Sequence, residues 1–283
     1  MPVAVVTDST AYLPAERSGA YGLARVPLTV VLNGRAGLEG DEISAADAVR
    51  ALDARRVAVS TSRPAPERFV QTYRHLLDQG ATGVVSVHLS AKLSGTVDAA
   101  RLAATEVGTD QVTVVDTRST GMGLGFPVLA AVAAAERGAD LATVRQAAVD
   151  AVGRTDAYFY VDTLEFLRRG GRINAASALF GTALSVKPIL HVVDGAIVLC
   201  DRVRTASRAL ARLVDLAVRA AGDAEADIAV HHLGAPQRAA ELVEVLADRL
   251  GRQLHDRYVT EAGAVIAAHA GPGLACVVVH RRG

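Results

Sequence analysis

Residues 84–96, Val-Val-Ser-Val-His-Leu-Ser-Ala-Lys-Leu-Ser-Gly-Thr, pass from a short apolar run into a turn rich in hydroxyl groups. An amphipathic stretch typical of a helix follows this turn. The same unit of strand, turn and helix recurs through the first half of the chain. Further strand-like runs of β-branched residues lie at residues 3–6, 26–32, 57–59 and 112–115. This alternation predicts an α/β domain with a mainly parallel sheet flanked by helices.

The pattern changes from about Thr155 onward. Asp194-Gly195 stands between two apolar runs, which is the strongest short-range signal for a type I′ β-hairpin. Helix-like stretches near 206–221 and 236–250 alternate with strand-like runs at 228–232 and 274–280. We therefore expect two closely packed domains, an α/β domain over residues 1–153 and an α+β domain with a mixed sheet over residues 154–283.

Composition narrows the class of protein. The 30 basic residues equal the 30 acidic ones, so no basic field exists to attract nucleic acid. The longest apolar run, residues 126–135, is too short to span a bilayer, and the first eight residues lack a basic signal region. We expect a cytoplasmic protein with no transmembrane segment. Cys200 and Cys276 stand apart in apolar runs, where buried reduced thiols without a functional role are expected.

Four turns that follow the predicted strands carry hydroxyl groups where a helix begins. They are residues 7–10, 60–64, 89–96 and 117–121. Ligands of an open parallel sheet bind where such turns gather, at the carboxyl ends of the strands. Helix N-terminal amides and hydroxyl groups bind anions, and each hydrogen bond to a charged group contributes about 1.5–3 kcal/mol. Any one turn could be only a helix cap, Asp8 for example, but four turns on one edge favour an anion site.

Candidate cations lie in the second half. Arg172 follows twin glycines, Arg204 precedes Thr205, and His269 begins the turn His-Ala-Gly-Pro-Gly. Twin glycines permit a sharp turn and a close approach of the backbone to a neighbour. An isolated arginine is usually a solvated surface charge, and a lone histidine is usually neutral and hydrogen-bonded. Because they lie in glycine-bearing turns, these three residues are candidate partners for the anion.

Several kinds of catalytic site find no support in the sequence. Ser94 lacks the Gly-x-Ser-x-Gly nucleophile elbow, residues 121–125 lack the spacing of a dinucleotide fingerprint, and a P-loop is absent. His231 and His232 are adjacent in a predicted strand, so their side chains point to opposite faces and cannot share a metal. We expect no metal, no cofactor and no catalytic residue.

Eight short motifs follow one another along the chain: Asp8-Ser9-Thr10, Val26-Pro27-Leu28, Thr61-Ser62-x-Pro64, Leu93-Ser94-Gly95-Thr96, Gly170-Gly171-Arg172-Ile173, Lys187-Pro188-Ile189, Arg204-Thr205 and His269-x-Gly271-Pro272-Gly273. In their order and spacing they resemble the DegV family of fatty-acid-binding proteins from end to end. The resemblance implies a two-domain, non-enzymatic protein that encloses one long-chain fatty acid. It further implies that the protein is the acyl-binding subunit of a fatty acid kinase in phospholipid metabolism. A separate ATP-using kinase protein would phosphorylate the carboxylate of the bound fatty acid to acyl phosphate. The resemblance is also compatible with transient contact between the protein and a membrane surface.

The resemblance also assigns roles to residues. By position, the fatty acid carboxylate would be bound by Thr61, Ser62, Ser94, Gly95, Thr96 and His269. Arg172 and Arg204 would face the phosphate or the kinase. Arg63 stands where the family commonly has Gln, and would either add a charge to the site or face solvent; Ala91 replaces a common Ser.

Two other functions fit the same residues. A serine hydrolase of acyl esters or thioesters would use Ser94 and His269. A binding protein for a phosphorylated metabolite or sugar would use the hydroxyl-rich turns.

Overall fold

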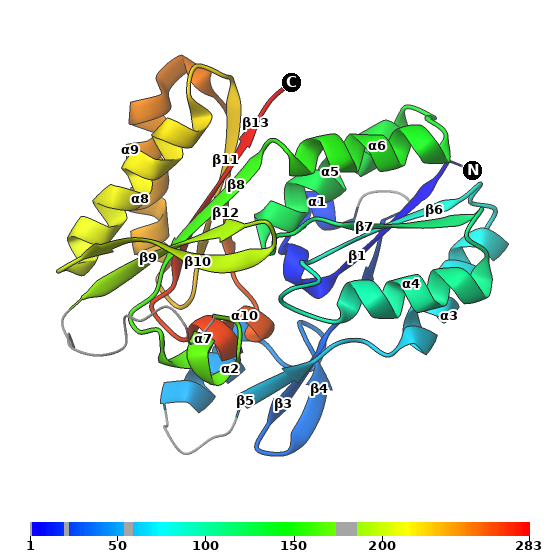
Figure 1. Cartoon of the computed structure of the whole chain (residues 1–283), viewed down its shortest axis with the longest axis horizontal. Coiled ribbons are helices and arrows are strands. Elements are labelled where there is room, and N and C mark those ends of the chain that lie inside the picture. Colours follow the sequence, from blue (N-terminus) through cyan, green and yellow to red (C-terminus); the bar gives the residue numbers. More distant parts are fainter. Residues whose placement is uncertain (1, 20–22, 54–58, 174–185) are drawn as a thin grey trace. The chain divides into compact units, whose positions relative to one another are not determined.

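The computed structural model describes residues 2–19, 23–53, 59–173 and 186–283 (Figure 1). The chain divides into two compact units, the first made of residues 1–29 and 62–155 and the second of residues 30–61 and 156–283. The expected boundary at residue 153 assigned residues 30–61 to the N-terminal half. They group with the second unit because their strands pair in a sheet separate from the parallel one.

The first unit is built on a four-stranded sheet in which every strand pair is parallel. Its order is β2-β1-β6-β7. The strands are β1 (Ala4–Asp8), β2 (Leu23–Val26), β6 (Val84–His88) and β7 (Val112–Asp116). This sheet confirms the predicted parallel arrangement, and it brings the carboxyl ends of β1, β6 and β7 to one edge.

Helices cover both faces of the parallel sheet (Figure 1). They are α3 (Pro66–Asp78) and α4 (Thr96–Val107) on one face, and α5 (Met122–Glu136) and α6 (Leu141–Val152) on the other. Side chains of β1 alternate between the faces, so Val6 packs with Phe69 of α3 while Val5 packs with Leu124 of α5. Two short elements, a 3-10 turn at Ser9–Ala11 and α1 (Ala15–Ser18), follow β1.

The expected strand over residues 26–32 is interrupted. β2 ends at Val26, and β3 (Thr29–Leu32) begins after Pro27-Leu28. Pro27 has no N–H to donate to a ladder, and the Leu28 N–H donates instead to Oγ of Ser9 at 3.0 Å. The chain therefore leaves the parallel sheet at this point.

A separate three-stranded sheet, in the order β4-β3-β5, contains β3, β4 (Arg35–Leu38) and β5 (Val59–Ser62). The prediction that all four hydroxyl-rich turns share one edge of the parallel sheet is thus wrong for the turn that follows β5. Residues 57–58 of the expected strand 57–59 lie outside the described residues.

The second unit contains a six-stranded mixed sheet in the order β10-β9-β8-β13-β11-β12. Its strands are β8 (Thr155–Tyr160), β9 (Lys187–Val193), β10 (Ala196–Val203), β11 (Ala226–His232), β12 (Leu254–Glu261) and β13 (Ala275–Arg281). β11 pairs parallel to β12 and antiparallel to β13, which confirms the expected mixed sheet. The helices α8 (Ala206–Ala221) and α9 (Pro236–Leu250) bury an apolar core against it, and the 3-10 turn Gly251–Gln253 follows α9 (Figure 1).

The predicted β-hairpin joins β9 to β10, which pair antiparallel. Asp194 and Gly195 have φ angles of 47° and 82°, so both central residues lie in the left-handed region. A type I′ turn requires this conformation, and the prediction from Asp-Gly is confirmed.

Three short helices of the second unit lie together: α2 (Ala45–Asp53), α7 (Glu165–Arg169) and α10 (Ala264–Ala270) (Figure 1). Before α2, the Ser44 N–H donates to Asp47 at 3.0 Å and the Asp47 N–H donates to Ser44 Oγ at 3.2 Å. This reciprocal pair is a capping box. α10 receives a cap from a distant residue, because the buried carboxylate of Glu39 accepts the Val265 N–H at 2.7 Å.

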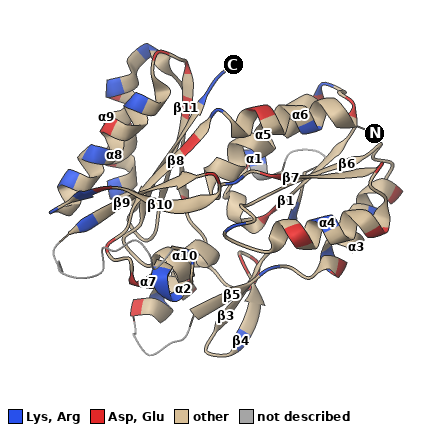
Figure 2. Ribbon diagram, viewed as in Figure 1, with Lys and Arg blue, Asp and Glu red and all other residues tan. Residues whose placement is uncertain are grey.

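Figure 2 shows Lys and Arg interspersed with Asp and Glu on the helices of both units, in keeping with the equal numbers of basic and acidic residues. Within the described parts of the chain, no helix has both the length and the apolar character needed to cross a membrane. Both cysteines are free thiols. The expected burial is wrong for Cys200, which is exposed on the edge strand β10, whereas burial raises the pKa of the Cys276 thiol to about 12.

Candidate functional site

Three hydroxyl-rich turns are joined by hydrogen bonds at the carboxyl edge of the parallel sheet. The Gly121 N–H donates to the Thr10 carbonyl at 2.8 Å, which connects the turns after β7 and β1. The Ser90 N–H donates to the Ser119 carbonyl at 2.8 Å, which connects the turns after β6 and β7. The convergence expected for these three turns is confirmed.

The first of these turns is structural. Asp8 is fully buried, and its Oδ1 accepts hydrogen bonds from the N–H of Thr10 at 3.0 Å and from the Thr10 hydroxyl at 2.6 Å. The Ser9 hydroxyl accepts the Leu28 N–H. Asp8 is therefore a helix cap, which is the simpler of the two interpretations allowed by the sequence.

A buried series of hydrogen bonds extends from Asp8 through β6. Asp8 Oδ2 lies 3.0 Å from Nδ1 of His88, and Nε2 of His88 lies 2.6 Å from Oγ of Ser86. The Tyr73 hydroxyl donates to Ser86 Oγ at 2.7 Å, and burial raises the pKa of Tyr73. All four side chains are fully buried, so this Ser–His–Asp arrangement is closed to substrate and holds β1, β6 and α3 together.

The second turn leads into α4 and carries Ser94. The hydroxyl groups of Ser94 and Thr96 are 2.9 Å apart; Thr96 is fully buried and Ser94 is half-buried. Gly95, at the N-cap position of α4, has no side chain to cap the first-turn amides. An N-terminus of this kind favours a nearby anion, and Ser94 is the more accessible of the two hydroxyl groups.

Arg63 extends over this turn. Its Nη1 donates to the Gly95 carbonyl at 3.3 Å. A Cβ atom at residue 95 would lie 2.8 Å from Nη1 and 2.9 Å from Cδ of Arg63. Only glycine at position 95 lets the guanidinium come this close to the backbone.

A second cluster of candidate residues lies in the second unit. The Oγ1 atom of Thr61, at the end of β5, is 2.8 Å from Nε2 of His269 in α10. The Glu39 cap holds the N-terminus of the helix that carries His269. The structure thus brings together two residues that the sequence analysis singled out separately.

The twin glycines after α7 place the backbone against His269. A Cβ atom at residue 170 would collide with the imidazole, and Gly171 has a φ of 70°. The sharp turn and close approach predicted for these glycines are confirmed. Arg172 donates from Nη1 to the Gly170 carbonyl. Burial and, to a smaller extent, the charge of Arg172 lower the pKa of His269 to about 4, so its imidazole is neutral at pH 7.

The remaining candidates make fewer contacts. Ser62 and Arg204 are exposed, and neither side chain has a hydrogen bond to any other residue that the structure describes. The local sequence pattern did not reveal Glu39, whose role depends on a helix start 226 residues away. Nor did it reveal Asp162, which forms an ion pair with Lys187 at 2.9 Å beneath the turn at Gly273.

The triad that a hydrolase would need is incomplete at His269. Its Nδ1 atom is buried and has no hydrogen-bond partner among the described residues. No described carboxylate therefore orients the imidazole as a general base, as the third member of a catalytic triad does. This arrangement weighs against the hydrolase alternative.

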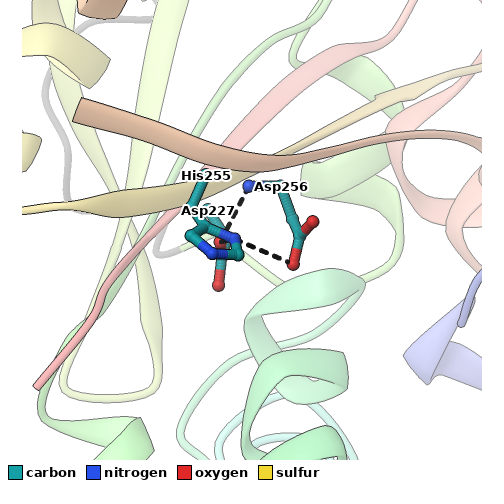
Figure 3. Close-up of side chains that lie close together, drawn as sticks. All are labelled: Asp227, His255 and Asp256. Atoms are coloured by element: carbon teal, nitrogen blue, oxygen red, sulfur yellow. Dashed lines mark hydrogen bonds and ion pairs between the residues drawn. The ribbon is translucent and has the colours of Figure 1, made fainter. Parts of the chain in front are cut away.

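Among the described residues, Asp227, His255 and Asp256 have the spacing of a metal site (Figure 3). His255 Nδ1 lies 3.4 Å from Asp256 Oδ2 and 3.9 Å from Asp227 Oδ1. Arg282 donates to both carboxylates, at 2.9 Å to Asp227 and 2.8 Å to Asp256. Because the Arg282 guanidinium already binds both carboxylates, we interpret these residues as an ion-pair cluster.

Comparison with known proteins identifies the family. A family model described as "Uncharacterised protein, DegV family" matches residues 2–282. The chain belongs to the DegV family. A DegV domain-containing protein of Streptomyces coelicolor is 55% identical over 280 residues, which are 99% of each chain. A DegV domain-containing protein of Mycobacterium tuberculosis is 42% identical over 99% of this chain and 97% of its own length.

Solved structures of DegV proteins have the same fold. A Thermus thermophilus DegV family protein, described by its fatty acid binding, superposes with a TM-score of 0.92 at 36% identity over 100% of both chains. Bacillus subtilis DegV, described as a fatty acid binding protein, gives a TM-score of 0.89 at 30% identity, again over 100% of both chains. The family expected from the order of motifs is confirmed.

Proposed function

We propose that this DegV protein binds one long-chain fatty acid and that Thr61 and Ser94 donate hydrogen bonds to its carboxylate. The contact between Thr61 and the neutral imidazole of His269 is the observation that carries this proposal. The two relatives described as fatty acid binding proteins support the choice of ligand. Ser62, Gly95 and Thr96 complete the polar group in this proposal.

The protonation of His269 determines what Thr61 can do. A neutral imidazole has one N–H, and a buried N–H without a partner is rarer in proteins than a buried acceptor without one. Since Nδ1 of His269 has no partner among the described residues, we assign the proton to Nε2. Nε2–H then donates to Thr61 Oγ1, which leaves the Thr61 hydroxyl proton available to a carboxylate oxygen.

The acyl chain supplies the affinity in this proposal. At about 0.8 kcal/mol per methylene, burial of a sixteen-carbon chain contributes on the order of 10 kcal/mol before ordering costs. The hydroxyl groups then need only orient the carboxylate and keep it within reach of a second protein. This division of roles suits a carrier rather than an enzyme.

A separate ATP-dependent kinase completes the proposed function. It transfers the γ-phosphoryl group of ATP to a carboxylate oxygen, which yields acyl phosphate and ADP for phospholipid synthesis in the cytoplasm. Arg172 and Arg204 are proposed to bind the phosphate or the kinase, since both carry cationic side chains in the second unit.

Mass spectrometry of an organic extract tests the binding function. We expect about one fatty acid per purified chain, or stoichiometric binding when palmitate or oleate is added to the delipidated protein. Absence of both would refute the proposal. Covalent labelling of Ser94 by a fluorophosphonate would favour a hydrolase, and thermal stabilisation by phosphate compounds but not by palmitate would favour a phosphorylated ligand.

A further inference from the structure

The Arg63 guanidinium lies against the backbone of the turn that carries Ser94. Its Nη1 atom is 3.3 Å from the Gly95 carbonyl, and the missing Cβ of Gly95 provides the space that Nη1 and Cδ occupy. Pro64, which is buried, follows directly and restricts Arg63 to extended backbone conformations. The side chain is exposed, yet its backbone is confined and its head has a defined place over the turn.

The positive charge of the Arg63 guanidinium is not neutralised by any carboxylate of the described residues. The guanidinium lies beside the N-terminus of α4, a 12-residue helix whose dipole is also positive at this end. None of the described carboxylates forms an ion pair with Arg63, and its single hydrogen bond in this part of the chain goes to the Gly95 carbonyl. Asp98 of the first turn forms its ion pair with Arg101, at 3.6 Å. A cation beside a positive dipole end is unfavourable until an anion binds there.

We propose that Arg63 determines the specificity of this protein for an ionised head group, by donating a charge-assisted hydrogen bond to the carboxylate that Ser94 binds. The proposal rests on the proposed function, because it concerns the same ligand. Ser94 offers a neutral hydroxyl group, which can bond a fatty alcohol as well as a carboxylate, although its bond to the carboxylate is stronger. The guanidinium discriminates between the two, since a neutral hydroxyl gains little from a positive charge.

The experiment compares two ligands of equal chain length that differ only in the head group. Palmitate and hexadecanol compete with a bound fluorescent fatty acid for the wild-type protein and for Arg63→Gln, at pH 8 and low salt. For an exposed charge pair we expect Arg63→Gln to weaken palmitate binding about two- to fivefold and to leave hexadecanol binding unchanged. Arg63→Lys retains the charge and should recover at least part of the preference.

Arg101→Gln is the matched control, because Arg101 is an exposed arginine in the middle of the same helix, α4. It should bind both ligands as the wild type does. Raising the salt concentration to 0.5 M should reduce the palmitate affinity of the wild type and have less effect on Arg63→Gln.

Two outcomes would overturn the assignment. Arg63→Gln could leave the ratio of palmitate to hexadecanol affinity unchanged, or it could weaken both ligands equally, which would make Arg63 a structural residue. If the wild type binds neither ligand, the proposed function itself fails, and the thermal stabilisation assay with phosphate compounds then identifies the class of anion.

Discussion

Nε2 of His269 lies 2.8 Å from Oγ1 of Thr61, although 208 residues separate them in the sequence. The imidazole is neutral at pH 7 because burial, aided by the charge of Arg172, lowers its pKa to about 4. A bound carboxylate would change this balance, since a negative charge favours the imidazolium form.

The titration of His269 therefore reports on the ligand. We expect NMR to give a pKa near 4 for the delipidated protein and a higher value when palmitate is bound. An unchanged His269 pKa at full ligand occupancy would place the carboxylate away from the Thr61 pair.

The buried histidines also make stability depend on pH. Burial lowers the pKa of His231, which is 2% exposed, to about 4 from an ordinary value of 6.5. Between these two values the unfolded chain binds more protons than the folded one, so the free energy of unfolding falls as the pH drops from 6.5 to 4. The loss from His231 is on the order of 3 kcal/mol at pH 4.

Chemical denaturation at pH 7, 5.5 and 4 measures this loss. His231→Gln should flatten the pH dependence of the free energy of unfolding below pH 6.5. Equal slopes for the wild type and His231→Gln would contradict the assignment of the effect to His231.

Substitutions of Ser94 and of Arg172 should separate fatty acid binding from phosphorylation of the bound fatty acid. Removal of a hydroxyl group that bonds a charged ligand costs about 1.5–3 kcal/mol, so Ser94→Ala should weaken palmitate binding roughly tenfold or more. Arg172→Ala should bind palmitate normally and reduce acyl phosphate formation with the kinase. Thr105→Ala, an exposed change further along α4, is the control for Ser94→Ala. Equal loss of binding in Ser94→Ala and Arg172→Ala would assign Arg172 to the carboxylate.

Gly170 should not tolerate a side chain. A methyl group there collides with the imidazole of His269, so Gly170→Ala should destabilise the protein by about 1–3 kcal/mol and weaken fatty acid binding. Gly153→Ala is a matched control, because its Cβ would meet only the Asp150 carbonyl at an ordinary 3.7 Å. Thermal denaturation of both variants tests the contrast, and similar melting temperatures would contradict it.

The buried series of hydrogen bonds that runs from Asp8 through His88 and Ser86 to Tyr73 should stabilise the first unit. Tyr73→Phe removes one buried bond and should cost about 1 kcal/mol. His88→Ala leaves a cavity and removes a partner of both Asp8 and Ser86, so it should cost about 3 kcal/mol or more. Denaturant titration measures both variants, and a smaller loss for His88→Ala than for Tyr73→Phe would contradict the central place of His88 in the series.

Local chemistry made much of the fold predictable from the sequence. Asp194-Gly195 determines its turn because few residues adopt two successive left-handed conformations, and Ser44 with Asp47 caps a helix through bonds three residues apart. The alternation of strand and helix patterns was sufficient for the parallel sheet. These features depend on interactions within a few residues, which a single sequence displays directly.

Contacts between segments distant in the sequence determined the second sheet and the candidate site. The sequence could not assign β3 and β5 to a sheet of their own, because strand pairing depends on which edges meet after the chain turns away at Pro27. It suggested Thr61, Ser94 and His269 as candidates but not their partners. Only the tertiary structure places Thr61 against His269, Arg63 over Gly95 and Glu39 at the start of α10, because each contact joins segments that are distant in sequence.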